Sequence, residues 1–369
     1  MDAAVERLID RVHAAGADGT ALRIRGTGSK DFYGEPPQGD LLETGDCAGI
    51  TSYEPSELVV TVRAGTPLAE LEHVLARQRQ SLPFEPPRFT ESANGVLGGT
   101  VGGMVAAGLS GPSRPSVGSV RDHVLGARLI NGRGELLKFG GTVIKNVAGY
   151  DVSRVLAGSL GTLGLLTEVS LKVLPVHSAE ATLKFECSQE SALQLLGGWG
   201  GQALPLSASR WTAEAGGTLR LRLRGATAAV RAACDRLGGE RADDDLARAD
   251  WQACRDQRLP WFLLEHNSQA LWRVSVPQTA PVLAIDGEPM VEWHGAQRWY
   301  RAPVDAAARI RAAARAVGGH ATLFRAASEV VGTSKLDAIS KPLMTIHRAL
   351  KREFDPHNIF NRGRLYPEL

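Results

Sequence analysis

A glycine-rich loop near the N-terminus has the composition of an anion-binding turn. The stretch RIRGTGSKDFYG, residues 23–34, passes from a short apolar strand pattern directly into GTGSK at residues 26–30. Successive backbone amides in such a turn can point inward around an anion, and glycine permits the positive φ that this geometry requires. Position 31 is Asp, so the loop is not the dinucleotide fingerprint GxGxxG, and no GxxxxGK[ST] occurs in the chain. The loop suits a phosphate or pyrophosphate, with an ordinary glycine turn as the alternative.

Two further segments are unusually rich in glycine. Residues 95–118 contain eight glycines in 24 positions, where the average over the chain predicts about three, and no charged residue occurs from Ser92 to Ser113. Residues 145–168, KNVAGYDVSRVLAGSLGTLGLLTE, place glycines three apart just before an apolar strand pattern. A bare backbone can lie against a ligand or pack against other backbone. Three such segments at strand ends together indicate a large cofactor with a phosphate part and a flat part.

The elements around these segments alternate between strands and helices. We expect an amphipathic helix at residues 1–16, with Val5, Leu8, Ile9 and Val12 at helical spacing. We also expect a helix at 66–78, with Thr66 as its N-cap and Pro67 at its first position, and a short helix at 150–158. The predicted strands of this part are 21–25, 57–65, 122–130, 134–139 and 165–175.

The composition changes after Pro175, because all seven tryptophans lie beyond it. Residues 179–325 predict antiparallel strands with helices, and we expect the tryptophans to serve as core or interface anchors.

Several motifs carry a family resemblance. RGTGS, PFEPP, GGTVGGMVAAGLSGPSRPSVGSVRDHVLG, KNVAGYD, GSLGTLGLLTEVSLKVLP and FDPHNIFNRGR occur in this order, and with them the chain resembles the FAD-linked oxidases of the vanillyl-alcohol-oxidase type. Within that superfamily it is most similar to the FAD-binding subunits of bacterial glycolate oxidases. The resemblance is strong over about 20–175 and 336–364. It implies an α+β chain: a PCMH-type FAD-binding domain of two α/β subdomains at 1–175, an α/β cap domain with an antiparallel sheet at 176–330, and a C-terminal segment at 331–369 returning to the flavin domain.

The resemblance also implies which residues bind FAD. They comprise the pyrophosphate loop, the second glycine-rich segment, the third, and the C-terminal segment: Gly26, Thr27, Gly28, Ser29 and Lys30; Pro86, Thr100, Val101, Gly102, Gly103, Gly108, Ser110, Gly111, Arg114, Gly118 and Asp122; Gly161, Gly164 and Leu165; Asn361 and Arg364. A cation such as Arg364 could stabilise the anion of the reduced flavin. We expect valine at Gly102 or Gly103 to abolish FAD retention while leaving much of the fold.

Two departures from the family limit what can be carried over. The first loop contains no His or Cys, so we expect non-covalent FAD. The His-rich metal motif and the EHG-type motif of catalytic relatives are also missing, since residues 325–341 read RAASEVVGTSKLDAISK. No metal site is therefore expected, and the catalytic residues stay unassigned. The candidate bases are His266, His294, His320 and His347, and the candidate carboxylate ligands are Arg298, Arg301 and Arg325; structural roles are the alternative for each.

The leading hypothesis follows from the resemblance. It is a FAD-binding subunit of a multi-subunit glycolate (2-hydroxy acid) oxidase, working beside a catalytic flavin subunit and an iron–sulfur subunit. The alternatives are a self-sufficient FAD-dependent dehydrogenase for D-2-hydroxy acids such as D-lactate, and a flavin-free scaffold subunit. A formal charge of +2 disfavours nucleic acid as the main partner. The four cysteines are widely spaced and are expected to be buried free thiols. We expect a cytoplasmic protein without a signal peptide or transmembrane helix, with membrane contact only through its partners.

Overall fold

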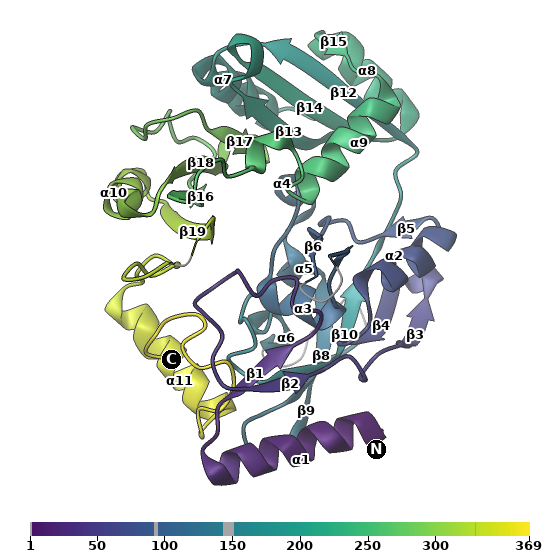
Figure 1. Ribbon diagram of the computed structural model, residues 1–369. Coiled ribbons are helices and arrows are strands. Elements are labelled where there is room, and N and C mark those ends of the chain that lie inside the picture. Colours follow the sequence, from purple (N-terminus) through teal and green to yellow (C-terminus); the bar gives the residue numbers. More distant parts are fainter. Residues whose placement is uncertain (1, 92–94, 143–150, 329) are drawn as a thin grey trace. The chain divides into compact units, whose positions relative to one another are not determined.

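The computed structural model describes residues 2–91, 95–142, 151–328 and 330–369. Contacts divide the chain into two compact units, labelled by element in Figure 1. The first unit comprises Met1–Ser110, Ser119–Val176 and Ala338–Leu369, and the second comprises Gly111–Gly118 and His177–Asp337. Most of the KNVAGYD motif falls in residues 143–150, outside the described residues.

Within its described residues, the first unit contains a five-stranded antiparallel sheet, two short antiparallel strand pairs and one parallel strand pair. Its helices are α1 (Ala3–Asp18), α2 (Leu68–Arg77), α3 (Val101–Ala107), α5 (Val120–His123), α6 (Val152–Val155) and α11 (Lys341–Phe354). Its strands are β1 (Leu22–Arg25), β2 (Asp40–Glu43), β3 (Ile50–Glu54), β4 (Val59–Arg63), β5 (Gln80–Ser81), β6 (Phe89–Thr90), β7 (Leu97–Gly98), β8 (Val124–Ile130), β9 (Leu136–Gly140), β10 (Leu165–Lys172) and β11 (Leu174–Pro175).

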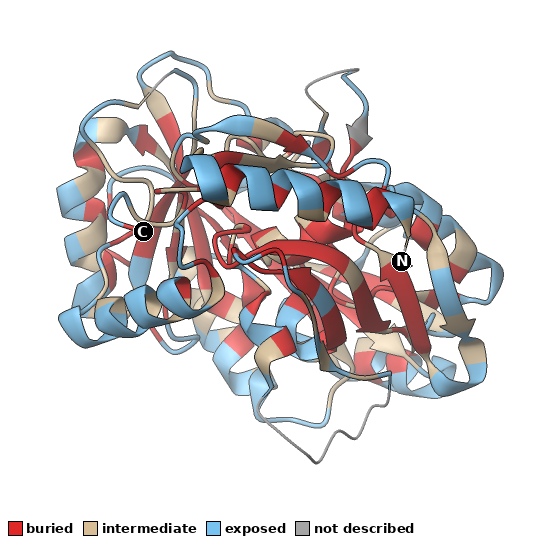
Figure 2. Cartoon of the chain, turned by 90° about the horizontal axis from the view of Figure 1, so that it is seen from below, coloured by how far each residue is buried: buried red, intermediate tan, exposed pale blue. Residues whose placement is uncertain are grey.

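Two hydrophobic cores organise the described part of this unit. Among the described residues, β3, β4, β10, β8 and β9 form an antiparallel sheet in that order, and its core packs against α2 and α3. The other core joins α1 to the parallel pair β1–β2, and Phe360 of the C-terminal segment completes it. Burial follows the predicted stripe of α1, because Val5, Leu8 and Val12 are buried and Ile9 packs partly buried against the same core. Figure 2 shows the same alternation of buried and exposed residues along the helices.

The second unit is organised by one large antiparallel sheet. Its helices are α4 (Arg114–Val117), α7 (Gln189–Gly200), α8 (Thr227–Leu237), α9 (Asp244–Arg255) and α10 (Ala307–Ala316). Its strands are β12 (Ala179–Glu186), β13 (Leu206–Thr212), β14 (Thr218–Gly225), β15 (Glu240–Arg241), β16 (Gln269–Ser275), β17 (Met290–Glu292), β18 (Gln297–Pro303) and β19 (His320–Ala326). In the described part of the chain these eight strands pair in the order β15-β12-β14-β13-β17-β18-β16-β19.

Five of the seven tryptophans and two of the four cysteines are buried. Trp211, Trp251, Trp272, Trp293 and Trp299 are buried inside the second unit, and the expectation of core anchors is confirmed for these five. All four cysteines are free thiols; Cys47 and Cys254 are buried, whereas Cys187 and Cys234 are only half-buried.

Two local predictions were wrong, and one helix was not predicted. The N-cap position of α2 is Pro67 rather than Thr66, because the hydroxyl of Thr66 is held by the backbone N–H and carbonyl of Gly49. Residues 122 and 123 end the short helix α5 instead of starting β8. Residues 101–107 form a helix that the sequence did not predict, because a stretch of small side chains has little hydrophobic periodicity.

The described chain contains no helix that is both long enough and apolar enough to cross a membrane.

Candidate cofactor-binding site

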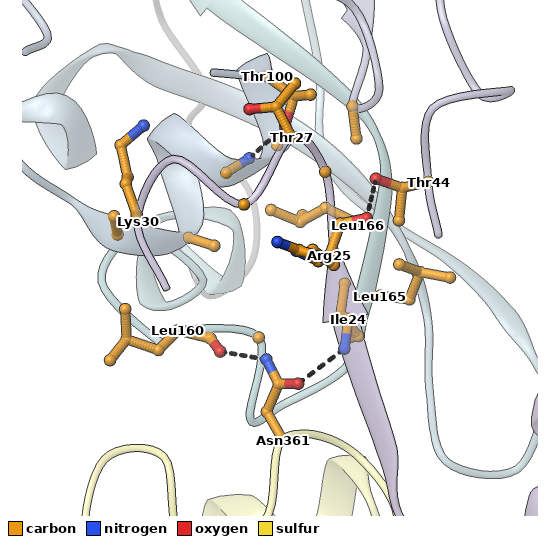
Figure 3. A pocket seen from close by; sticks show the side chains of 18 of the residues that line it. Ile24, Arg25, Thr27, Lys30, Thr44, Thr100, Leu160, Leu165, Leu166 and Asn361 are labelled. Carbon is orange, nitrogen blue, oxygen red and sulfur yellow. Dashed lines mark hydrogen bonds between the residues drawn. The ribbon is translucent and has the colours of Figure 1, made fainter. Parts of the chain in front are cut away.

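A cavity in the first unit lies where β1, α3, the start of β10 and the C-terminal segment meet. It holds about 770 Å³ of empty space, part of it open to solvent. Figure 3 shows side chains from these elements turned toward one space. Thirteen of the predicted site residues line it, from all four predicted groups: Gly26, Thr27, Gly28, Ser29, Lys30, Thr100, Gly102, Gly103, Gly161, Gly164, Leu165, Asn361 and Arg364.

The loop after β1 supplies free hydrogen-bond donors to this cavity. Gly28 has φ +75°, the left-handed conformation that a nest of amides uses. The amides of Thr27 and Ser29 make no hydrogen bond within the described chain, and the Oγ1 of Thr27 is buried without a partner there. Buried polar groups are normally satisfied, so an unpaired set beside a cavity indicates a ligand that pairs with it.

Lys30 is the cation most available to a ligand in the cavity. Its Nζ lies 3.5 Å from the Oγ of Ser29 and 5.9 Å from the ring centroid of Phe89. Burial lowers the pKa of Lys30 to about 8, against a smaller opposing effect of Glu91. The ammonium group is therefore still largely protonated at neutral pH, and an anionic ligand would favour its charged form.

The glycines of α3 line the cavity, but their amides already donate to groups of the protein. The amide of Val101 donates to the carbonyl of Thr66, and that of Gly102 donates to the carbonyl of Ala64. The amide of Gly103 donates to the Oγ1 of Thr100, the N-cap of the helix. These three amides are therefore already used within the protein.

Gly102 and Gly103 also differ in what a side chain would meet. A Cβ on Gly102 would lie 2.7 Å from the Cβ and 3.0 Å from the carbonyl oxygen of Ala64, so this glycine is required for packing. A Cβ on Gly103 would meet only the Oγ1 of Thr100, at 3.2 Å. Substitution of Gly102 is therefore expected to disturb the fold itself, whereas Gly103 presents bare backbone to the cavity.

The C-terminal segment closes the cavity through Asn361 and Arg364. The Oδ1 of Asn361 accepts from the amide of Ile24 at 2.8 Å, and its Nδ2 donates to the carbonyl of Leu160 at 2.6 Å (Figure 3).

Arg364 lines the cavity with a guanidinium that holds protein backbone. It donates to the carbonyls of Lys30, Asp31 and Glu35. Burial lowers the pKa of Arg364 to about 10, which still leaves it charged at neutral pH. Arg364 is buried and supports the loop at residues 30–35, while its role toward the flavin stays a prediction.

The remaining predicted residues do not line this cavity. Pro86 and Val101 are buried, Gly108 ends α3 against the backbone of Gly158, and Asp122 caps α5 through Ser119. The Oγ of Ser110 accepts from the amide of Val120. The other three belong to the second unit: Gly111, Arg114 and Gly118.

Nine lining residues were not predicted: Ile24, Arg25, Asp31, Thr44, Ala64, Ala106, Ala107, Leu160 and Leu166. Arg25 and Asp31 flank the glycine loop, so their position beside it was a usable signal. They form an ion pair with 3.0 Å between Nε and Oδ2. Thr44 and Ala64 follow the ends of β2 and β4, and only the paired sheets reveal that these ends face the loop.

None of the candidate bases or carboxylate ligands lines this cavity. His294 binds the Oγ of Ser209 through its amide and Nδ1, and burial lowers its pKa to about 4. Arg298 is fully buried and donates to three backbone carbonyls, while Arg325 donates to the carbonyl of Phe262. Arg301 pairs with Glu265, and the ring of His347 lies against Tyr366. His266 and His320 are exposed.

Together these features fit a dinucleotide with an anionic centre. The loop itself provides free amides, the unpaired hydroxyl of Thr27 and the ammonium group of Lys30, and a pyrophosphate would be held there. Apolar residues from β1, α3 and β10, including Ile24, Ala107 and Leu165, provide the flat walls that a ring system needs.

Comparison with known proteins supports this assignment. Residues 3–140 match the family described as FAD binding domain. Glycolate oxidase subunit GlcE of Escherichia coli is 44% identical over 364 residues, covering 99% of this chain and 98% of that one. D-lactate dehydrogenase of Anaerostipes hadrus is 33% identical over 134 residues, 36% of this chain and 26% of that protein. A solved structure of alkyldihydroxyacetonephosphate synthase shares the fold, with a TM-score of 0.66 at 18% identity over 96% of this chain and 74% of that chain.

The match to the FAD binding domain and the lining of the cavity define a flavoprotein with FAD as its cofactor, and its fold is of the vanillyl-alcohol-oxidase type. The loop that would hold the pyrophosphate offers no His or Cys for a covalent link, in agreement with non-covalent FAD. The chain belongs to the family of the glycolate oxidase subunit GlcE.

Proposed function

We propose that this chain is the FAD-binding subunit of a multi-subunit glycolate oxidase, and that its FAD exchanges electrons with partner subunits. The observation that carries the proposal is the likeness over the whole chain to a protein that is itself named a subunit. The proposed partners are a catalytic flavin subunit and an iron–sulfur subunit. Contact with a membrane, in this proposal, is made only through those partners.

The lining of the cavity supports electron exchange over unaided oxidation of a 2-hydroxy acid. FAD supplies the redox centre, but removing a hydride from a hydroxy acid also needs a base for the hydroxyl proton. The described lining contains no His, Tyr, Cys or Glu. Its one carboxylate, Asp31, is paired with Arg25. The residues of the cavity are therefore suited to binding and orienting the cofactor.

The proposed FAD site can be tested in the purified chain by its absorption spectrum. A flavin spectrum that disappears after denaturation and filtration is expected, since nothing in the loop would link FAD covalently. A colourless chain that takes up no added FAD would favour a scaffold role and contradict the site.

The proposed partnership can be tested by turnover. Glycolate and D-lactate are supplied with an artificial electron acceptor, first to the chain alone and then to the chain co-expressed with the other subunits. Turnover is expected only in the complex. Full turnover by the chain alone would instead establish a self-sufficient dehydrogenase, the activity that the partial likeness to D-lactate dehydrogenase suggests.

A further inference from the structure

The segment Gly111–Gly118 departs from the first unit and joins the second. The chain leaves the first unit after Ser110 and re-enters it at Ser119. The ends of this excursion are held together, because the amide of Val120 donates to the Oγ of Ser110 at 3.2 Å. We call Gly111–Gly118 the docking segment.

Three side-chain interactions fix the docking segment on the second unit. The indole N–H of Trp293 donates to the carbonyl of Gly111 at 3.0 Å in a buried environment. The guanidinium of Arg114 lies 4.4 Å from the centroid of the Trp293 ring, within the range of a cation–π interaction. The hydroxyl of Ser116 is within hydrogen-bond distance of the carbonyls of Leu206 and Ser207 on β13, at 2.6 and 3.1 Å. The beginning and the middle of the segment are thus both attached.

The residues that present Trp293 have an uncommon backbone conformation. Trp293 and His294 have φ values of +53° and +55°, and Gly295 follows with +97°. Ser209 fixes this turn, since its Oγ binds both the amide and the Nδ1 of His294, at 2.9 and 3.0 Å. Adjacent left-handed residues other than glycine persist only where their surroundings enforce them, and they concentrate at functional positions.

The docking segment begins a few residues after the wall of the FAD cavity. Ala106 and Ala107 line the cavity. The backbone is closely packed at Gly108, because a Cβ there would lie 2.9 Å from both Cα and N of Gly158. The carbonyl of Gly111 that Trp293 holds is therefore separated from the cavity wall by only Gly108, Leu109 and Ser110.

We propose that Trp293 is a positioning residue for the FAD site. By holding the docking segment on the second unit, it fixes the path of the chain that leaves Ala106 and Ala107, and cofactor retention thereby depends on the second unit. The inference rests on the assignment of FAD to the cavity of the first unit. Trp293 is not among the residues that line the cavity, so its effect is transmitted along the backbone.

The test replaces Trp293 with phenylalanine in the full chain, which keeps an aromatic ring and removes the donor to Gly111. The FAD dissociation constant is measured by flavin fluorescence, and amide hydrogen exchange is followed over residues 105–120. Roughly 3- to 10-fold weaker FAD binding is expected, the effect of losing one hydrogen bond. Faster exchange within the docking segment is expected as well. Ser116→Ala, at an exposed position, should act in the same direction even if Trp293→Phe folds poorly.

Trp211→Phe is the matched control. The indole of Trp211 on β13 donates to the carbonyl of Cys187 at 2.9 Å, within the same unit and with similar burial, but its acceptor is not part of the docking segment. It should change neither FAD affinity nor exchange over residues 105–120. Equal FAD binding by the wild type, Trp293→Phe and Ser116→Ala would overturn the positioning role, as would an equal loss in Trp211→Phe. A wild-type chain that binds no FAD would overturn the cavity assignment, and this inference with it.

Discussion

The side chain of Asn361 forms a hydrogen bond with the backbone of Ile24, although the two residues are 337 positions apart in the sequence. The amide of Ile24 donates to the Oδ1 of Asn361 at 2.8 Å, while the Nδ2 of the same side chain donates to the carbonyl of Leu160 at 2.6 Å. One amide side chain thus connects the strand before the glycine loop at residues 26–30, the third glycine-rich segment and the C-terminal segment. All three residues of this contact line the cavity.

Replacing Asn361 with aspartate should weaken both the fold and FAD binding. Aspartate keeps the acceptor for Ile24 but places a carboxylate oxygen against the carbonyl of Leu160, where a donor is needed. The free energy of unfolding should fall by about 1–3 kcal/mol, the cost of leaving a buried polar group unpaired. Urea denaturation and flavin fluorescence measure the two effects. Asn358→Asp is the control, because Asn358 also has a positive φ, of +49°, but is exposed. Equal effects of the two variants would contradict the role of Asn361.

Lys30 should carry much of the attraction for the anionic part of FAD. Replacing it with methionine keeps most of the side-chain volume and removes the charge. A charged hydrogen bond contributes about 1.5–3 kcal/mol, so FAD affinity should fall at least tenfold. Lys184→Met removes a lysine from the second unit, where it pairs with Glu240, and should leave FAD affinity unchanged. A Lys30→Met variant with normal affinity would place the phosphates elsewhere.

FAD affinity should also depend on pH through Lys30. The pKa of Lys30 in the free protein is about 8, lowered mainly by burial. A bound phosphate favours the ammonium form and raises this pKa, so binding takes up a proton only above the free value. Affinity should therefore be constant at lower pH and fall as the pH rises above about 8. Titrations of the wild type and Lys30→Met at several pH values check this, and the decline should be missing in the variant.

Two neighbouring glycines should respond in opposite ways to substitution. Leucine at Gly103 should block FAD binding while changing the free energy of unfolding by no more than about 1 kcal/mol, because leucine suits a helix better than glycine. Alanine at Gly102 should lower stability by about 1–3 kcal/mol, since its Cβ would press on the backbone of Ala64. Flavin content and thermal unfolding distinguish the two. Normal FAD content in Gly103→Leu would show that the cofactor lies elsewhere.

The buried ion pair of α11 should be essential for the C-terminal segment. The Nζ of Lys351 donates to the Oδ2 of Asp355 at 2.7 Å and to the carbonyls of Thr162 and Phe360, each at 2.8 Å. Lys351→Met should lower the free energy of unfolding by roughly 3–5 kcal/mol, because it leaves the carboxylate of Asp355 buried without its cation. Lys341→Met, at an exposed position on the same helix, should have little effect in the same denaturation experiment.

Local patterns in the sequence were sufficient for much of the first unit. The stripe of Val5, Leu8 and Val12 predicted α1, and the GTGSK loop was placed correctly at the end of β1, beside the cavity. These features depend on periodicity and on the conformational freedom of glycine, which neighbouring residues determine. The missed helix α3 shows the limit of this reasoning, since small residues allow a helix without predicting one.

The sequence by itself determined the cofactor class and the positions of the glycines that make room for it. Only the tertiary structure decided which groups remain free to bind. The amide of Gly102 donates to the carbonyl of Ala64, and the guanidinium of Arg364 donates to carbonyls of the 30–35 loop. The indole of Trp293 donates to a carbonyl of the docking segment. Each of these hydrogen bonds joins residues far apart in the chain. A donor can be assigned to a ligand only after folding has shown which acceptors of the protein itself lie within reach.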